Sequence, residues 1–195
     1  SSLSLAHSCG DQIVEAIRLR HPTMGKRAAW ARAVELLGQM QLSDPALTAS
    51  QYPFQLSGGM RQRVMIAMAL ASEPRILIAD EPTTALDVTT QAQILKLIRD
   101  LQQRRKTAVM FITHDFGVVA EIADRVVVMQ HGVIVEQGTA TDVLHHPRHA
   151  YTRQLIAAVP PLKAPPPRAL AADNILTITN VSKTYRTGGF LGRGA

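Results

Sequence analysis

The stretch RILIADEP, residues 75–82, decides the fold, because four apolar residues run without interruption into two carboxylates and a proline. A second run of this kind, AVMFITHD at residues 108–115, ends in a threonine, a histidine and an aspartate. Continuous apolar runs of this length are typical of strands that crossing helices bury on both faces. A helical pattern between the two runs makes the strands parallel, so the sequence predicts an α/β fold.

Helical periodicity surrounds these strands. Residues 11–20 and 26–40 should form two helices that pair as a small helical layer, and helices are also expected from Met60 to Ala71 and over residues 88–104. The stretch SDPALTASQYP, residues 43–53, is interpreted as a loop. The positions expected to face the core are Ala29, Ala33, Leu36, Leu37, Met40, Met60, Val64, Ala67, Met68, Ala71, Ala92, Leu95, Ile98 and Leu101. Beyond the second strand, residues 124–138 predict a hairpin that turns at His131 and Gly132.

Composition excludes several classes of protein. The chain has 195 residues, 46% of them hydrophobic and 18% charged, which suits one globular core with part of another domain attached. Its longest uncharged apolar run, Val64 to Ala71, is far below the roughly 20 residues that span a bilayer. The single cysteine, Cys9, permits no internal disulfide and is expected to be a small buried hydrophobe. The net charge of +6 comes from scattered residues, and we interpret Arg104 to Lys106 as a solvated helix end.

Ser57, Gly58 and Gly59 stand where a loop gives way to the helix that follows. Ser57 alone would be an ordinary N-cap, which is the simpler reading of an isolated Ser-Gly-Gly. Two residues without a Cβ also let another molecule approach the helix N-terminus, where free N–H groups favour an anion such as phosphate. The neighbouring motifs favour this second interpretation.

The ends of the two strands carry the candidate chemistry. In open α/β sheets, ligands bind beyond the carboxyl ends of the strands. Asp80 there can hold Mg²⁺, directly or through water, and Glu81 can orient or deprotonate a nucleophilic water. His114 can donate to a phosphate oxygen, although a lone histidine at this place is as often structural.

Together these residues resemble the ATP-binding cassette ATPases. LSGGM, residues 56–60, is similar to the signature of that family, ILIADE to its Walker B strand with the catalytic glutamate, TALD to its D-loop and ITHD to its switch-histidine loop. The resemblance covers about residues 1–158 and implies the cofactors ATP and Mg²⁺. It also implies a second cassette as partner, whose bound γ-phosphate faces the signature residues, which are Ser57, Gly58, Gly59 and Met60.

The resemblance assigns the remaining roles residue by residue. It implies that Asp87 lies in the seam between two cassettes and Asp80 near Mg²⁺. It further implies that Glu81 lies beside the attacking water and His114 near the γ-phosphate. The fold it implies is a mostly parallel central sheet with flanking helices, together with a small helical subdomain.

A P-loop is absent from the sequence. The pattern G-x-x-x-x-G-K-[ST] does not occur, and the nearest candidate, HPTMGKR at residues 21–27, has Arg20 in place of the first glycine and Arg27 in place of the hydroxyl residue. We therefore expect a partial cassette, with its helical subdomain at about residues 1–72 and its α/β core at about 73–158. The chain alone should bind ATP weakly at best and should not hydrolyse it.

Two stretches narrow the resemblance to the ATPase subunits of bacterial oligopeptide and dipeptide importers. They are LSGGMRQRVMIAMAL, residues 56–70, and HHPRHAYTRQLIAAVP, residues 145–160. The implied location is the cytoplasmic face of the inner membrane, where the ATPase contacts membrane-spanning permease subunits. A solute-binding protein delivers the solute to those subunits. Ribosome-associated tandem cassettes and DNA-associated cassettes are the alternatives. The short proline-rich linker disfavours the ribosome-associated proteins, and the lack of a heptad insertion disfavours the DNA-associated ones. No nucleic acid is therefore expected as a partner.

The C-terminal part reads as the start of another domain. Residues 159–173 are rich in proline and predict a linker. Residues 174–195 begin with NILTITNVSKTY, whose alternation predicts a half-buried strand. This segment resembles the first strand of a second cassette, in which Tyr185 would match the aromatic residue that stacks on adenine. The resemblance thus implies a tandem protein, with an isolated β tail as the alternative.

Overall fold

The computed structural model describes residues 3–84, 86–159 and 177–184. By its internal contacts the chain divides into two units, Ser1–Val159 and Pro160–Ala195, and each is described by itself. The first unit contains all the helices and strands found among the described residues. Tyr185 lies outside the described residues.

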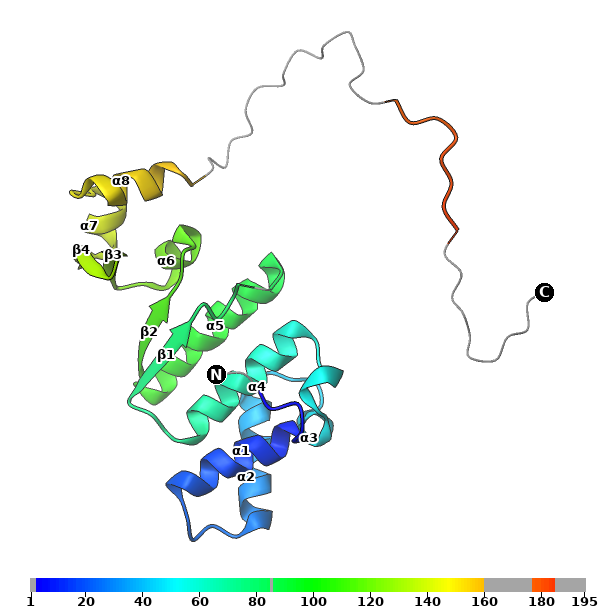
Figure 1. The fold of residues 1–195 in the computed structure, drawn as a ribbon. Coiled ribbons are helices and arrows are strands. Elements are labelled where there is room, and N and C mark those ends of the chain that lie inside the picture. The colour runs from blue at the N-terminus through cyan, green and yellow to red at the C-terminus, as the bar shows by residue number, and fades with distance from the viewer. Residues whose placement is uncertain (1–2, 85, 160–176, 185–195) are drawn as a thin grey trace. The chain divides into compact units, whose positions relative to one another are not determined.

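The first unit starts with helices and continues with alternating strands and helices (Figure 1). In chain order the elements are α1 Cys9–Arg20, α2 Lys26–Gln39, α3 Pro45–Ser50, a 3-10 turn at Pro53–Gln55, α4 Gly58–Ala71, β1 Ile76–Asp80, α5 Val88–Arg105, β2 Ala108–Ile112, α6 Phe116–Ile122, β3 Arg125–Gln130, β4 Val133–Thr139, α7 Ala140–His145 and α8 Ala150–Ala157. The α/β prediction is confirmed.

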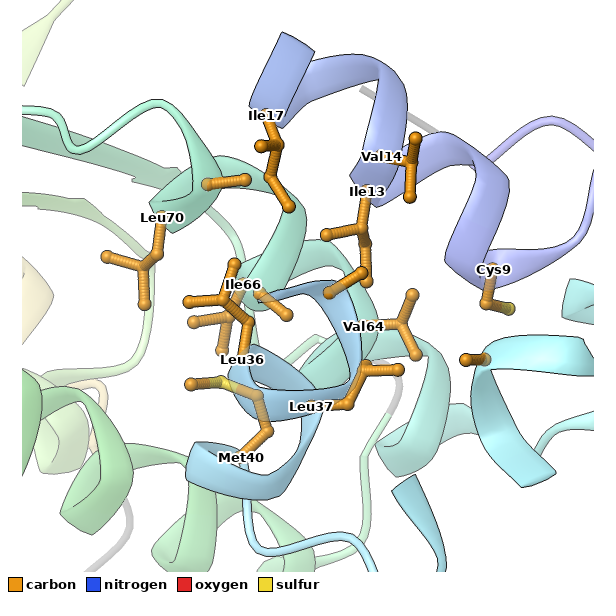
Figure 2. Close-up of a cluster of buried hydrophobic side chains, with 14 of the residues drawn as sticks. Cys9, Ile13, Val14, Ile17, Leu36, Leu37, Met40, Val64, Ile66 and Leu70 are labelled. Atoms are coloured by element: carbon orange, nitrogen blue, oxygen red, sulfur yellow. The ribbon is translucent and has the colours of Figure 1, made fainter. Parts of the chain in front are cut away.

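The main hydrophobic core lies between α1, α2, α4 and one side of α5. Figure 2 shows side chains from α1, α2 and α4 meeting at its centre, among them Ile13, Leu36 and Val64. All three are fully or almost fully buried, and so is Cys9, as predicted. Burial also raises the pKa of the Cys9 thiol. The predicted helical layer is therefore confirmed.

Two details of the helical part differ from the prediction. The stretch read as a loop contains α3, which begins with Asp44 as its N-cap and Pro45 in its first turn. Both residues are ordinary helix-start signals, so this helix could have been predicted. On α5, Ala92 is exposed. The predicted Leu95, Ile98 and Leu101 are buried, and the buried face also includes Ile94 and Leu97.

β1 and β2 form a parallel pair in which Ile76 lies opposite Ala108 and Asp80 opposite Ile112. Helix α5 makes the crossover between them, and Figure 1 shows it running alongside both strands. Apolar runs of this kind are typical of strands that are buried on both faces, but here the residues of one face are exposed in alternation, because the described helices cover only the other face.

β3 and β4 form the predicted antiparallel hairpin. His131 and Gly132 link the strands with φ angles of 51° and 80°, the left-handed conformation that a tight hairpin turn requires. Val128 pairs with Glu136 but Met129 pairs with Ile134, so the ladder contains a bulge at residue 135. The hairpin is followed by the short helices α7 and α8.

The described part of the second unit is residues 177–184, and it contains no strand. All eight residues are exposed, including Ile178 and Val181. The predicted half-buried strand is wrong for these residues, because a strand needs a neighbouring strand to pair its backbone groups.

Among the residues that the structure describes, no helix is both long and apolar enough to cross a membrane.

Candidate functional site

The N-terminus of α4 carries the Ser-Gly-Gly stretch. Ser57 is the N-cap, and its Oγ accepts a hydrogen bond from the backbone N–H of Met60 at 3.3 Å. The helix offers no internal partner for its first N–H groups, and this cap satisfies only that of Met60. Ser57 and Gly58 are exposed. An anion can therefore approach the start of this helix.

Gly59 has a neighbour inside the chain. A Cβ built at Gly59 would lie 2.6 Å from Cγ2 of Thr90 in α5, far closer than two carbon atoms can approach. The absence of a side chain at Gly59 therefore lets α4 and α5 pack together. Gly59 thus has a packing role inside the chain, and Gly58 is the one of the two glycines that is exposed.

Glu81 and His114 lie in direct contact just beyond the ends of β1 and β2. The carboxylate Oε1 of Glu81 is 3.0 Å from Nδ1 of His114, and Oε2 accepts a hydrogen bond from the Thr84 hydroxyl at 3.0 Å. The backbone N–H of Glu81 also donates to the carbonyl of Ile112 at 2.9 Å. The sequence reasoning had proposed both residues for the site, and the structure brings them together.

The environment of Glu81 favours its ionised form. Hydrogen bonding to His114 is the largest cause that lowers the pKa of Glu81, followed by the bond from Thr84. The carboxylate stays accessible, with about half of the side chain exposed (47%). Glu81 also has a φ of 44°, a left-handed conformation that costs a non-glycine residue about 1 kcal/mol and is found preferentially at functional sites. It can orient a water molecule and accept a proton from it.

Asp80 is the last residue of β1 and is exposed. Within residues 3–84, 86–159 and 177–184, no group of three or more His, Cys, Asp or Glu side chains could hold a metal ion. Mg²⁺ in nucleotide sites commonly takes only one or two carboxylates, and phosphate oxygens and water supply the other ligands. Asp80 fits such a role and would not hold the ion alone.

Asp87 is the N-cap of α5. Oδ1 accepts a hydrogen bond from the backbone N–H of Thr90 at 2.9 Å, and Oδ2 accepts one from the Thr90 hydroxyl at 2.6 Å. The Thr90 hydroxyl is the largest cause that lowers the pKa of Asp87. Asp87 is therefore a fixed, ionised and exposed group at the start of the helix.

A cleft of about 600 Å³ lies between the N-terminus of α4 and the end of β1. Gly58 of α4 and Glu81 at the end of β1 both line it, whereas Asp80, Asp87 and His114 do not. The lining residues are Leu3, Leu5, Pro53, Gly58, Arg61, Gln62, Met65, Glu81, Pro82, Thr84 and Leu86. The start of α4 and the Glu81 carboxylate therefore face the same cleft.

Three residues with hydrogen bonds in or near these regions are not predicted from the sequence. Thr84 and Thr90 each stand three residues after the acid they contact, a spacing that local hydrogen bonds in turns and caps often use. Arg63 lies in the apolar stripe of α4, and its partners are far away in the sequence. An arginine at a core position was the only signal for it.

Comparison with known families gives two matches. Residues 5–84 match the family described as "ABC transporter", and residues 135–183 match "Oligopeptide/dipeptide transporter, C-terminal region". The first match contains the Ser-Gly-Gly stretch and Glu81, and the second contains the rest of β4 from residue 135, together with α7 and α8. Both agree with the resemblance that the motifs had suggested.

Individual relatives agree with these matches. The glutathione import ATP-binding protein GsiA of Escherichia coli strain K12 is 56% identical over 164 residues, 84% of this chain and 26% of GsiA. The "probable peptide ABC transporter ATP-binding protein y4tR" of Sinorhizobium fredii is 56% identical over 160 residues, 82% of this chain and 48% of that protein. The chain thus spans about a quarter and about half of these relatives.

Solved structures show the same similarity. The dimeric structure of MJ0796, a bacterial ABC transporter cassette, has a TM-score of 0.63 at 31% identity, and the match covers 71% of this chain and 59% of that one. A post-hydrolysis structure of MJ0796 bound to ADP and Pi has a TM-score of 0.62 at 31% identity, with the same coverage. The motifs, the fold and these matches agree, and the chain belongs to the family of ABC transporter ATP-binding proteins.

Proposed function

We propose that the chain supplies the signature helix and the catalytic glutamate of an ATPase that powers an ABC importer of peptides or related small solutes. The observation that carries this proposal is the Glu81 carboxylate, held by His114 and Thr84 in the cleft that Gly58 also lines. A water-orienting carboxylate and an anion-accepting helix N-terminus are two of the parts that ATP hydrolysis needs.

His114 would act on the terminal phosphate through its second ring nitrogen. The ionised carboxylate of Glu81 can only accept a hydrogen bond, so Nδ1 of His114 is the donor and carries a proton. In a neutral ring, Nε2 is then an acceptor. Donation to a phosphate oxygen needs a second proton, carried by Nε2. His114 would in this way contact the γ-phosphate and sense its presence.

The remaining site residues take roles in a pair of cassettes. Ser57, Gly58, Gly59 and Met60 would cap an ATP whose phosphates are held by a P-loop that is not among these 195 residues, and Asp87 would lie in the seam of the pair. Asp80 would contribute one ligand, directly or through water, to a Mg²⁺ that the phosphates bind. Tyr185 would stack on adenine in a second domain. The name of MJ0796, a cassette with a dimeric structure, supports pairing.

The proposal for transport rests on the relatives. GsiA is named for glutathione import and y4tR for peptide transport, which supports import over the ribosome-associated and DNA-associated alternatives. We infer that the partners are permease subunits at the cytoplasmic face of the inner membrane. A solute-binding protein would deliver the solute to these subunits. The proposed domains are residues 1–158 as a partial cassette, 159–173 as a linker and 174–195 as the start of another cassette.

The catalytic role of Glu81 is tested in a chimera that joins the P-loop-bearing segment of a homologous cassette ahead of Ser1. Glu81→Gln removes the negative charge that orients and deprotonates water but keeps the size of the side chain. We expect ATP binding to persist and the hydrolysis rate to fall by about 10²-fold or more. Steady-state phosphate release and equilibrium nucleotide binding measure the two effects.

Glu121→Gln is the matched control, because Glu121 is an exposed glutamate on α6. It should leave both values unchanged. Hydrolysis by the Glu81→Gln chimera at the rate of the unmutated chimera would remove Glu81 from the proposed role.

A further inference from the structure

Arg63 is a buried cation on the helix that starts with the Ser-Gly-Gly stretch. Only 8% of the residue is exposed, and its burial lowers the pKa of the guanidinium. Nη1 donates to the carbonyl of Met40 at the end of α2 at 2.7 Å, and Nη2 donates to Oε1 of Gln93 in α5 at 2.9 Å. Among the described residues, no carboxylate lies within ion-pair distance of it. A buried charge with only neutral partners is costly, so the contacts it makes need a reason.

A second contact joins the same two helices. Gly59 packs against Thr90, as described above, and Thr90 in turn binds both carboxylate oxygens of Asp87. Gly59 stands four residues before Arg63 in α4, and Thr90 stands three residues before Gln93 in α5. Residues at these spacings lie on one face of a helix. The two contacts therefore follow each other along the α4–α5 interface, and the contact of Gly59 with Thr90 lies at the N-termini of both helices.

We propose that Arg63 is a positioning residue that locks α4 to α5, so that Ser57 and Gly58 keep a fixed position relative to Asp87. The contact of Arg63 with Met40 extends the lock to α2. The signature helix and the D-loop then move as one body. What the positioned residues do rests on the proposed function, whereas the lock itself depends only on contacts within the chain.

The lock makes a specific prediction for Arg63→Met in the 195-residue chain. Methionine fills similar space without the charge, so global stability need not fall, because buried charges are often replaced by apolar residues at little cost. We expect amide hydrogen exchange to accelerate about tenfold in residues 57–63 and in residues 87–93 together, because both helix starts lose their common restraint. Exchange in α1 should stay unchanged. Mass spectrometry of peptic fragments measures all three segments.

Two further variants test the arginine itself. Arg63→Lys keeps the charge but has a single donor group, so it should give an intermediate acceleration. Arg61→Met is the matched control, because Arg61 is exposed two residues earlier in the same helix. It should leave exchange in residues 87–93 as in the unmutated chain.

The contact of Gly59 with Thr90 has its own test. Gly59→Ala places a Cβ against Cγ2 of Thr90 and should accelerate exchange in the same two segments. Adding Thr90→Ser removes that methyl group but keeps the hydroxyl that binds Asp87, so the double variant should return close to the original exchange rates.

Three results would overturn the lock. Acceleration spread equally over α1, α4 and α5 would mean that Arg63 contributes only to global stability. Acceleration confined to residues 57–63 would mean that α5 does not depend on it. Failure of Thr90→Ser to rescue Gly59→Ala would mean that the two helices are not coupled at this contact. None of these measurements uses nucleotide, so failure of the proposed ATPase function would show itself separately.

Discussion

Glu136 connects the hairpin to the segment before α8. Its Oε1 accepts a hydrogen bond from the backbone N–H of Arg148 at 2.7 Å, and its Oε2 accepts one from that of His149 at 3.0 Å. The bulge at residue 135 lies directly before it in β4. The backbone N–H of Arg148 is the largest cause that lowers the pKa of Glu136. The ionised carboxylate therefore holds the start of α8 against β4.

This contact predicts a stability that depends on pH. Because the pKa of Glu136 in the folded chain lies below its ordinary value of 4.5, the carboxylate stabilises the fold above that value, and the contribution is lost as pH falls through the lowered pKa. Glu136→Gln should lower the melting temperature at neutral pH, because an amide can present only one acceptor oxygen. The difference from the unmutated chain should shrink in acid. Thermal unfolding followed by circular dichroism across this range measures it.

Glu15→Gln is the control for Glu136→Gln. Glu15 is exposed on α1, and its substitution changes the net charge of the chain by the same amount. A difference between Glu136→Gln and the unmutated chain that stays constant from neutral to acid pH would contradict the role of the carboxylate.

Two leucines in the helices, Leu36 and Leu19, differ greatly in their exposure to solvent. Leu36 in α2 is 1% exposed within the core that α1, α2 and α4 share, whereas Leu19 in the last turn of α1 is 79% exposed. Leu36→Ala should reduce the free energy of unfolding by about 3 kcal/mol, because it removes buried methyl groups and leaves a cavity. Leu19→Ala should change it by less than about 0.5 kcal/mol. Urea unfolding followed by circular dichroism compares the two variants, and equal losses would contradict the location of the core.

The helices were easier to predict than their contacts. Periodicity is local, so the apolar positions of α2 predicted its buried face, and the apolar run before Asp80 predicted β1, the strand that Glu81 follows. The contact of Arg63 with Gln93 joins residues 30 positions apart, and no local pattern contains it. The exposed face of β1 and β2 could not be read from periodicity either, since a continuous apolar run is the same whether one face or both are covered.

For the whole molecule, the exposed face of the β1 and β2 sheet has the clearest consequence. Ile78 and Met110 lie opposite each other in register and are 63% and 56% exposed, and Ile76 and Ile112 continue the same face. Exposed apolar surface of this kind promotes association. We expect the molar mass of the 195-residue chain, measured by sedimentation velocity, to rise with concentration.

Ile78→Lys combined with Met110→Lys should suppress this association, because it places two charges on the apolar face. Leu19→Lys is the control, since it adds a charge at an exposed leucine outside the sheet. A monomer at every concentration would mean that this face does not drive association, and so would unchanged association in the double variant.

We infer that the N-terminus of α4 faces an anion bound by another cassette. Gly58→Asp tests it in the chimera with Glu81→Gln, where bound ATP is consumed only slowly. Aspartate in the first turn suits the helix dipole, so α4 should still form, but its charge would repel a γ-phosphate. Gly58→Asn is the control of the same shape without the charge.

Light scattering with and without MgATP compares the mass of these chimeras, and equilibrium nucleotide binding is measured alongside. We expect ATP to pair the Glu81→Gln chimera, Gly58→Asp to abolish pairing while ATP binding persists, and Gly58→Asn to retain more pairing than Gly58→Asp. ATP-driven pairing that is equally strong with aspartate at position 58 would contradict the inference that α4 faces a bound anion.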